Sequence, residues 1–123
     1  VTLWNLILDD KGAPNRPKGC RTCFGAIEIS SKTYDYASLD RKSHYYNIAH
    51  CSKVVRPDAW CVDVDASLPQ GVEMAAFVNV DGSLAVLAVN QAEQPQEVVV
   101  KGAKREFTLT LPAGSIASAR WTE

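Results

Sequence analysis

Few side chains of this chain have the type and spacing that chemistry requires, and the four cysteines are the strongest candidates. They are Cys20, Cys23, Cys51 and Cys61. An even number allows complete pairing and is compatible with an oxidising compartment, where disulfides persist. Cys20 and Cys23 also have the C-x-x-C spacing that redox enzymes and zinc sites use. The cysteines therefore indicate disulfides, a metal site or thiol chemistry.

The surrounding sequence argues against redox chemistry and zinc. A redox C-x-x-C motif belongs at the strand-to-helix turn of a βαβ unit, and no such unit follows Cys23. A structural zinc site needs a second close pair of ligands, whereas Cys51 and Cys61 are ten positions apart. His44 and His50 lack a zinc-knuckle arrangement as well. Structural disulfides are favoured, free buried thiols stay open, and no metal or cofactor is expected.

The carboxylates do not form a catalytic pattern. Glu28, Glu73 and Glu97 lie in predicted strands without a partner arrangement, so an acid/base pair within this chain is not expected. Asp63 and Asp65 share one face of a predicted strand. Two carboxylates fall short of the six to eight oxygens that calcium prefers, and a solvated face is the favoured interpretation.

Composition limits the class of protein. The chain has 123 residues, of which 46% are hydrophobic and 22% are charged, as expected for one globular core. The net charge of −1 supplies no basic surface for nucleic acid or anionic membranes. The longest apolar run, at 84–89, is far shorter than a membrane-spanning helix requires.

The first half of the chain mixes strand, loop and helix signals. Residues 1–8 (VTLWNLIL) start inside an apolar run, which predicts a strand and a chain cut from a longer protein. A long Gly- and Pro-containing loop follows at 9–22, called the rim loop below. Residues 24–30 predict a strand, with a possible return strand at 32–36. A helix is predicted over 40–55, capped by Asp40 and followed by Pro57.

The second half predicts an antiparallel β-sandwich, because short β-prone runs alternate with turn residues at regular spacing. The predicted strands are 58–65, 72–79, 84–90, 95–101, 105–111 and 114–121. Asp81 and Gly82 suit a tight hairpin. The strand at 84–90 is apolar on both faces and should lie centrally in its sheet.

Several motifs in this order resemble glycoside hydrolase family 30, to which glucosylceramidase belongs. The motifs are WNL at 4–6, DKGAPN at 10–15, YYNIAHCSKVVRP at 45–57, AFVNVDGS at 76–83 and LPAGSI at 111–116. The stretch from Gly19 to Gly25 is most similar to secreted bacterial members. The resemblance implies a mainly β chain, in which residues 1–57 are the last strand, rim loop and helix of a (β/α)8 barrel. Residues 58–123 would then form the attached β-sandwich domain.

The resemblance also implies a function. The family's retaining β-glycosidases use two carboxyl groups about 5 to 5.5 Å apart. In the family these glutamates lie on earlier barrel strands, upstream of Val1, so this chain would hold no catalytic residue. Trp4 matches a family tryptophan at the sugar pocket, and Asn5 would bind a sugar hydroxyl or support a neighbour that does. A tryptophan packed in the core is the alternative.

Two departures from the family pattern concern cysteine. The family has an aromatic residue at the position of Cys51 and a basic residue near Cys61, so joint replacement suggests that these two form a disulfide. Cys20 would then pair with Cys23. The turn at Asp58, where the family has glycine, also departs from the pattern.

The sequence thus predicts the C-terminal portion of a secreted, glucosylceramidase-like or β-1,6-glucanase-like hydrolase. Its partners would be the upstream barrel and, through it, a β-linked glucoside or glucan, with no nucleic acid and no membrane span. The alternative is a stand-alone β-sandwich. It would be a carbohydrate-binding module if aromatics such as Trp60 or Trp121 are exposed, or a structural module if both are buried.

Overall fold

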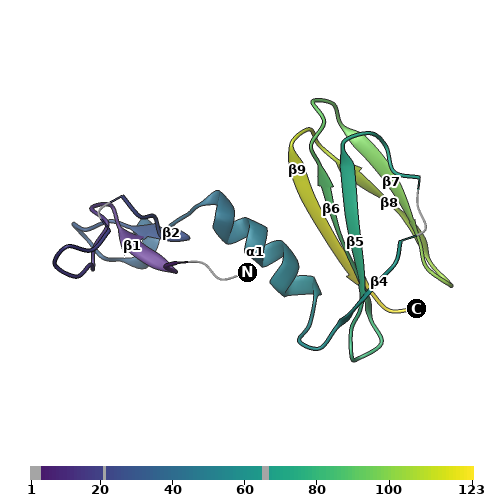
Figure 1. Ribbon diagram of the computed structural model, residues 1–123, viewed down its shortest axis with the longest axis horizontal. Helices are drawn as coiled ribbons and strands as arrows, with labels where there is room; N and C mark the ends of the chain where they lie inside the picture. Colours follow the sequence, from purple (N-terminus) through teal and green to yellow (C-terminus); the bar gives the residue numbers. More distant parts are fainter. Residues whose placement is uncertain (1–3, 21, 65–66) are drawn as a thin grey trace. The chain divides into compact units, whose positions relative to one another are not determined.

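A computed structural model of the chain describes residues 4–20, 22–64 and 67–123 (Figure 1). The chain divides into two compact units, Val1–Ile48 and Ala49–Glu123, which we call the N-terminal and C-terminal units. In the described part of the chain most elements are strands, and all but one of the strand pairings are antiparallel. The prediction of a mainly β chain with antiparallel sheets is confirmed. Among the described residues, no helix is long and apolar enough to cross a membrane.

The N-terminal unit contains one small sheet of order β1-β2-β3. Its strands are β1 (Ile7–Asp9), β2 (Ile27–Ile29) and β3 (Asp40–Arg41), and a 3₁₀ turn, η1 (Tyr36–Ser38), precedes β3. β1 and β2 are parallel, with Ile7 opposite Ile27, and β3 is antiparallel to β2. Three short strands bury little apolar surface, so this sheet needs other interactions to hold its shape.

Two predictions for this unit are wrong. The return strand expected at 32–36 is absent, because Tyr34 has a left-handed φ of 49° and Asp35 caps η1. The return strand is β3 instead. Asp40 belongs to β3 and does not cap the helix, so α1 (Ser43–Val54) starts three residues later than predicted (40 to 43). The first predicted strand, 1–8, falls partly outside the described residues, and β1 begins at Ile7.

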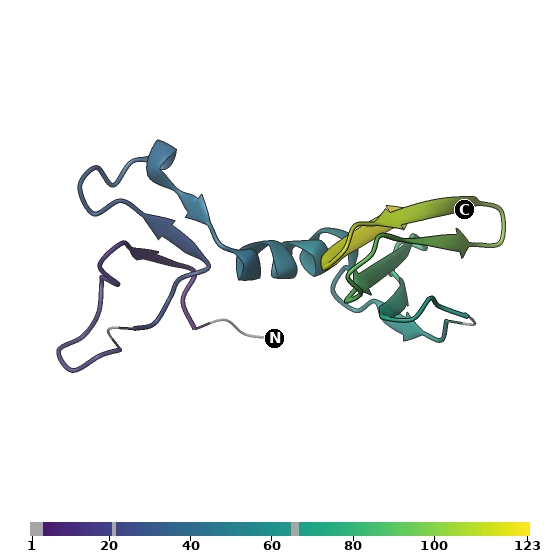
Figure 2. The same cartoon turned by 90° about the horizontal axis from the view of Figure 1, so that it is seen from above.

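The C-terminal unit consists of a four-stranded sheet and a two-stranded one, of orders β4-β5-β6-β9 and β7-β8. The strands are β4 (Trp60–Val62), β5 (Val72–Val78), β6 (Leu84–Asn90), β7 (Gln96–Lys101), β8 (Glu106–Leu111) and β9 (Ser115–Trp121). Each lies within or close to a predicted strand, and β6 is central, as predicted. Figures 1 and 2 show the β7–β8 pair alongside the larger sheet. Asp81 and Gly82 form the predicted hairpin between β5 and β6, with Gly82 at φ 78°.

An apolar cluster between the two sheets forms the core of this unit. Its buried members are Val72, Ala88, Val98 and Leu111, and Leu68, Met74, Leu109 and Ala117 pack against them. Leu111 has no exposed surface, and burial of such a side chain stabilises the fold by about 1.5–3 kcal/mol. The fully buried Asn90 bonds the backbone around this core: its Nδ2 group donates to the carbonyl oxygens of Gln94, Leu111 and Pro112.

Candidate functional site

Trp4 and Asn5 lie just before β1, and Asn5 is bonded to the residue that precedes β2. The indole of Trp4 is 80% exposed, so it is not a core residue of the part of the chain that the structure describes. The carbonyl oxygen of Asn5 accepts a hydrogen bond from Ala26 N–H at 3.1 Å, and that of Leu6 accepts one from Ile27 N–H at 2.8 Å. Asn5 is therefore fixed through its backbone to the segment that leads into β2.

The segment at Gly25 and Ala26 passes very close to β1. A Cβ atom at Gly25 would lie 2.6 Å from the carbonyl oxygen of Ile27 and 2.7 Å from the amide nitrogen of Leu8. Both are backbone atoms that cannot move aside, so only glycine fits at this position. On the helix side, Lys42 N–H donates to the Ala26 carbonyl at 3.0 Å, and His44 Nε2 bonds to the Gly25 carbonyl at 2.9 Å.

Asp9 anchors the rim loop, a role that the sequence analysis did not predict. Its buried carboxylate accepts hydrogen bonds from the N–H groups of Ala13 (2.7 Å) and Lys11 (2.9 Å). The hydroxyl of Tyr34 donates to the other oxygen at 2.8 Å. The Ala13 bond, followed by the Tyr34 bond, lowers the pKa of Asp9, and the same Asp9 bond raises the pKa of Tyr34. The sequence signal that could have predicted this role is an aspartate shortly before Gly12, because aspartate side chains often bond the backbone of a following turn.

A neighbouring carboxylate adds a second attachment. Asp10 Oδ1 accepts a hydrogen bond from Ser31 N–H at 3.0 Å, and hydrogen bonds from Ser31 lower the pKa of Asp10. Asp9 and Asp10 thus connect the rim loop to the segment that follows β2. Both carboxylates act here as structural anchors.

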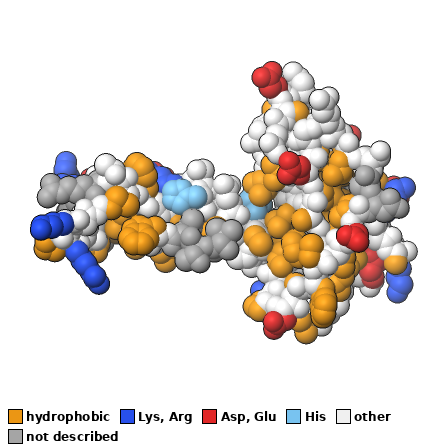
Figure 3. Space-filling view, in the orientation of Figure 1, with side chains coloured by type: hydrophobic (Ala, Val, Ile, Leu, Met, Phe, Trp, Pro, Cys, Tyr) orange, Lys and Arg blue, Asp and Glu red, His pale blue; other side chains and the backbone are white. Residues whose placement is uncertain are grey.

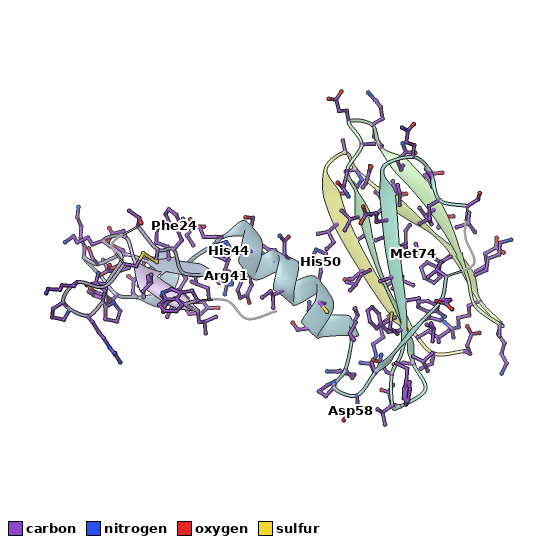
Figure 4. All side chains as sticks on the ribbon, viewed as in Figure 1. Phe24, Arg41, His44, His50, Asp58 and Met74 are labelled. Atoms are coloured by element: carbon purple, nitrogen blue, oxygen red, sulfur yellow. A yellow bond between two sulfur atoms is a disulfide. The ribbon has the colours of Figure 1, made fainter. Side chains whose placement is uncertain are left out.

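The disulfide predictions have different outcomes. Cys20 and Cys23 form a disulfide with their Cα atoms 5.6 Å apart, drawn as a yellow bond in Figure 4. Cys51 and Cys61 are free and exposed, so the predicted bond between them is wrong. The alternative of buried free thiols is wrong as well. Cys51 is exposed on α1 and Cys61 is exposed on β4, and no bond joins them.

A cleft of about 200 Å³ lies in the N-terminal unit, beside these anchors. It is lined by residues 8–12, residues 22–25, Glu28 and Lys42. Lys42 Nζ forms ion pairs with Glu28 at 3.4 Å and with Asp40, and the Asp40 bond is the main cause of a raised Lys42 pKa. The cleft wall therefore combines these charged groups with the apolar side chains of Leu8 and Phe24, the second of which is labelled in Figure 4.

The three tryptophans differ in their surroundings. Trp121 packs edge-to-face on Phe107 at 5.0 Å, and its Nε1 donates to the Glu123 carboxylate. Trp60, on the edge strand β4, is 76% exposed. An open groove of about 660 Å³ lies beside β4 between the two sheets, and Trp121 forms part of its wall. Figure 3 shows hydrophobic side chains gathered on one face of this unit.

A polar junction fixes the end of α1 to the β5–β6 hairpin. Asn79, which is 2% exposed, donates from Nδ2 to the Val54 carbonyl at 3.0 Å and accepts from Arg56 N–H at 2.8 Å. Its Nδ2 also donates to Ser83 Oγ at 2.9 Å. One turn earlier on the helix, His50 Nδ1 bonds Ser118 Oγ of β9 at 3.0 Å. These contacts are absent from the sequence-based predictions.

The C-terminal unit matches a known protein family. The model of the glycosyl hydrolase family 30 beta sandwich domain matches residues 58–119, which include the six described strands of this unit except for the last two residues of β9. The chain belongs to glycoside hydrolase family 30. The Asn79 junction and the core around Leu111 both have members within the matched family 30 domain.

Solved structures extend the likeness to almost the whole chain. The endo-β1,6-glucanase BT3312 has 38% sequence identity and a TM-score of 0.90 over 98% of this chain. SrfJ from Salmonella typhimurium has 27% identity and a TM-score of 0.78 over 96% of it. The chain spans only about a quarter of either protein, 26% and 25% respectively. No curated protein matches the chain.

Proposed function

We propose that this chain is the C-terminal portion of a retaining β-glycosidase. Residues 58–123 would be the β-sandwich that supports a catalytic (β/α)8 barrel, and residues 1–57 would be the barrel's last strand, rim loop and helix. The observation that carries the proposal is the likeness to an endo-β1,6-glucanase, with a TM-score of 0.90 over 98% of the chain. The exposed apolar side chains of the N-terminal unit, including Trp4, Leu6 and Phe24, add support, because monomers rarely leave such groups uncovered together.

The substrate class follows from the same relative. Because BT3312 is an endo-β1,6-glucanase, β1,6-linked gluco-oligosaccharides are the first substrates to test. A glucosylceramidase-like specificity for a single β-glucoside is the second. Both are β-linked glucosides, and the barrel's other loops would choose between them.

The chain's own contribution would be binding, not bond cleavage. In a retaining mechanism one carboxyl group attacks the sugar, while the other protonates the leaving group and then activates water. We assign both groups to barrel strands that precede Val1. The exposed face of Trp4 would pack against a pyranose ring, and the Asn5 amide would donate to or accept from a sugar hydroxyl.

The test compares the isolated chain with the longer protein that contains it. The longer protein should hydrolyse β1,6-gluco-oligosaccharides, and the isolated 123-residue chain should not. Trp4→Ala in the longer protein should raise KM about tenfold or more, as expected for a lost stacking contact. Cleavage by the isolated chain at enzymatic rates would contradict the assignment of both carboxyl groups to the upstream barrel.

A secreted location is a further part of the proposal. The Cys20–Cys23 disulfide supports it, because such bonds persist in oxidising compartments. Fractionation of cells that express the longer protein tests this, and accumulation in the reducing cytosol would count against it.

One observation favours a second function, binding of carbohydrate by the sandwich itself. Trp60 presents an exposed indole on an edge strand, whereas Trp121 is engaged with Phe107 and Glu123. Calorimetric titration of the isolated chain with a soluble β-glucan tests it. Binding that Trp60→Ala abolishes would support this second function, and the absence of binding would reject it.

A further inference from the structure

A histidine at the start of α1 holds the backbone that carries Asn5. We propose that His44 is a positioning residue of the sugar pocket, acting on Asn5 and Trp4 through the peptide group between Gly25 and Ala26. The proposal rests on the function proposed above, in which Trp4 and Asn5 bind sugar. His44 itself would touch no substrate.

The bond between His44 and Gly25 has a defined direction. A carbonyl oxygen can only accept, so Nε2 of His44 must carry a hydrogen and donate it to the Gly25 oxygen at 2.9 Å. The neutral tautomer with hydrogen on Nε2 and the protonated imidazolium both satisfy this requirement. His44 Nε2 is therefore the donor of this bond.

The same peptide group bonds on its opposite side to Asn5. The Gly25 carbonyl and the Ala26 N–H belong to one planar peptide unit, whose atoms rotate together. His44 holds its oxygen at 2.9 Å, and the Asn5 carbonyl accepts from its N–H at 3.1 Å. One rigid plane thus connects the imidazole to the backbone of Asn5, and such chained hydrogen bonds strengthen one another.

Glycine makes this plane dependent on its partners. Gly25 has the widest choice of backbone angles of any residue, and no side chain that could restrict the plane. The Lys42 bond acts on the carbonyl of Ala26, which belongs to the next peptide group. His44 is therefore the group that fixes the Gly25 carbonyl, and its loss frees the plane to rotate away from Asn5.

The helix carries a matched control. His50 lies on the same helix and makes a similar side-chain bond, at 3.0 Å, to Ser118 of the C-terminal unit. Figure 4 labels both histidines. His50→Leu removes a histidine hydrogen bond from α1 without touching the Gly25 peptide, so it separates a general loss of helix stability from the proposed effect.

The first experiment follows backbone amide exchange by NMR in the 123-residue chain. His44→Leu should make the Ala26 amide exchange about five- to tenfold faster, as expected from loss of one hydrogen bond. His44→Gln should restore slow exchange, because its amide nitrogen is the same number of bonds from Cα as Nε2. His50→Leu should leave Ala26 unchanged. Equal exchange at Ala26 in His44→Leu and the wild-type chain would overturn the proposal.

The second experiment measures hydrolysis of a β1,6-linked gluco-oligosaccharide by the longer protein. His44→Leu should raise KM about three- to tenfold with kcat nearly unchanged, and His44→Gln should restore KM. Trp4→Ala serves as the reference for the pocket. If Trp4→Ala raises KM and His44→Leu does not, the positioning role is overturned while the proposed function stands. If neither changes KM, the assignment of Trp4 and Asn5 to the sugar pocket fails together with the positioning role, while hydrolysis by the longer protein still supports the glycosidase function.

Discussion

The two units of this chain are stabilised by different kinds of interaction. The C-terminal unit is stabilised mainly by an apolar core between two sheets, centred on Leu111. The described strands of the N-terminal unit are two or three residues long, and the contacts of a buried carboxylate, a disulfide and a histidine bond fix its loops. The comparison indicates that the core of the C-terminal unit stabilises that unit by itself. The contacts of the N-terminal unit instead hold particular backbone atoms in place. This division agrees with the proposed function, in which the sandwich would support a loop-bearing catalytic domain.

The largest effect should come from the core of the C-terminal unit. Leu111→Ala should lower the free energy of unfolding of that unit by about 2–5 kcal/mol, because it removes a fully buried side chain and leaves a cavity. Urea unfolding followed by NMR signals from both units measures this. Val99→Ala, on the neighbouring β7 strand but exposed, is the control and should cost less than about 0.5 kcal/mol. Equal losses for the two variants would contradict an apolar core as the main stabilising element.

The next largest effect should come from the Asn79 junction. Asn79→Ala leaves the Val54 carbonyl and the Arg56 N–H without their partner, which should cost about 1–3 kcal/mol. Faster amide exchange should appear first at Arg56. Asn47→Ala, at an exposed helix position, is the matched control. If the hydrogen bonds of Asn79 do not stabilise the unit, the Asn79→Ala and Asn47→Ala variants will unfold at the same urea concentration, which would contradict this prediction.

Removal of the disulfide should affect only the N-terminal unit. Replacing Cys20 and Cys23 with serine should destabilise that unit by no more than about 2 kcal/mol, because the bond closes a very short loop. The C-terminal signals should not shift. Thiol titration of the unreduced chain should find two reactive groups, Cys51 and Cys61. Four reactive groups, or a destabilised sandwich, would contradict this arrangement.

The smallest effect near neutral pH should come from titration of the Asp9 cluster. The pKa of Asp9 is lower in the folded chain than in the unfolded one. Asp9 therefore contributes fully to the stability of the folded state above about pH 4, and this stability is lost as pH falls through the folded pKa. The pKa of Tyr34 is raised in the folded chain. Tyr34 therefore contributes fully to the stability of the folded state below about pH 10, and this stability is lost as pH rises through the folded pKa. NMR-monitored titration of Asp9→Asn should show a weaker acid response of the rim loop, in which only the part due to Asp10 remains. An unchanged acid response would mean that other groups control the loop.

The sequence predicted the C-terminal unit well because period-two patterns and turn residues dominate there. The hairpin at Asp81 and Gly82 and the central position of β6 followed directly from local residue types. The N-terminal unit was harder to predict. The position of the return strand depends on the left-handed backbone at Tyr34 and on pairing between residues far apart in sequence.

The polar contacts that fix the candidate site also could not be predicted from the sequence. Asp9, Asn79 and His44 each bond atoms brought together only by the fold, and nothing in their local spacing identifies these partners. The Cys20–Cys23 disulfide was predicted only as the pair that remained once Cys51 had been assigned to Cys61. The bond expected between Cys51 and Cys61 rested on a pattern of replacement, which says nothing about the direction of the two side chains.

The most direct test of the account is the stereochemistry of cleavage by the longer protein. Proton NMR of a β1,6-linked gluco-oligosaccharide, recorded within the first minutes of reaction, distinguishes the anomer that forms first. A retaining enzyme whose two carboxyl groups lie on the upstream barrel should release the β-anomer first. Initial release of the α-anomer, or an unchanged rate when every carboxylate upstream of Val1 is removed, would contradict it.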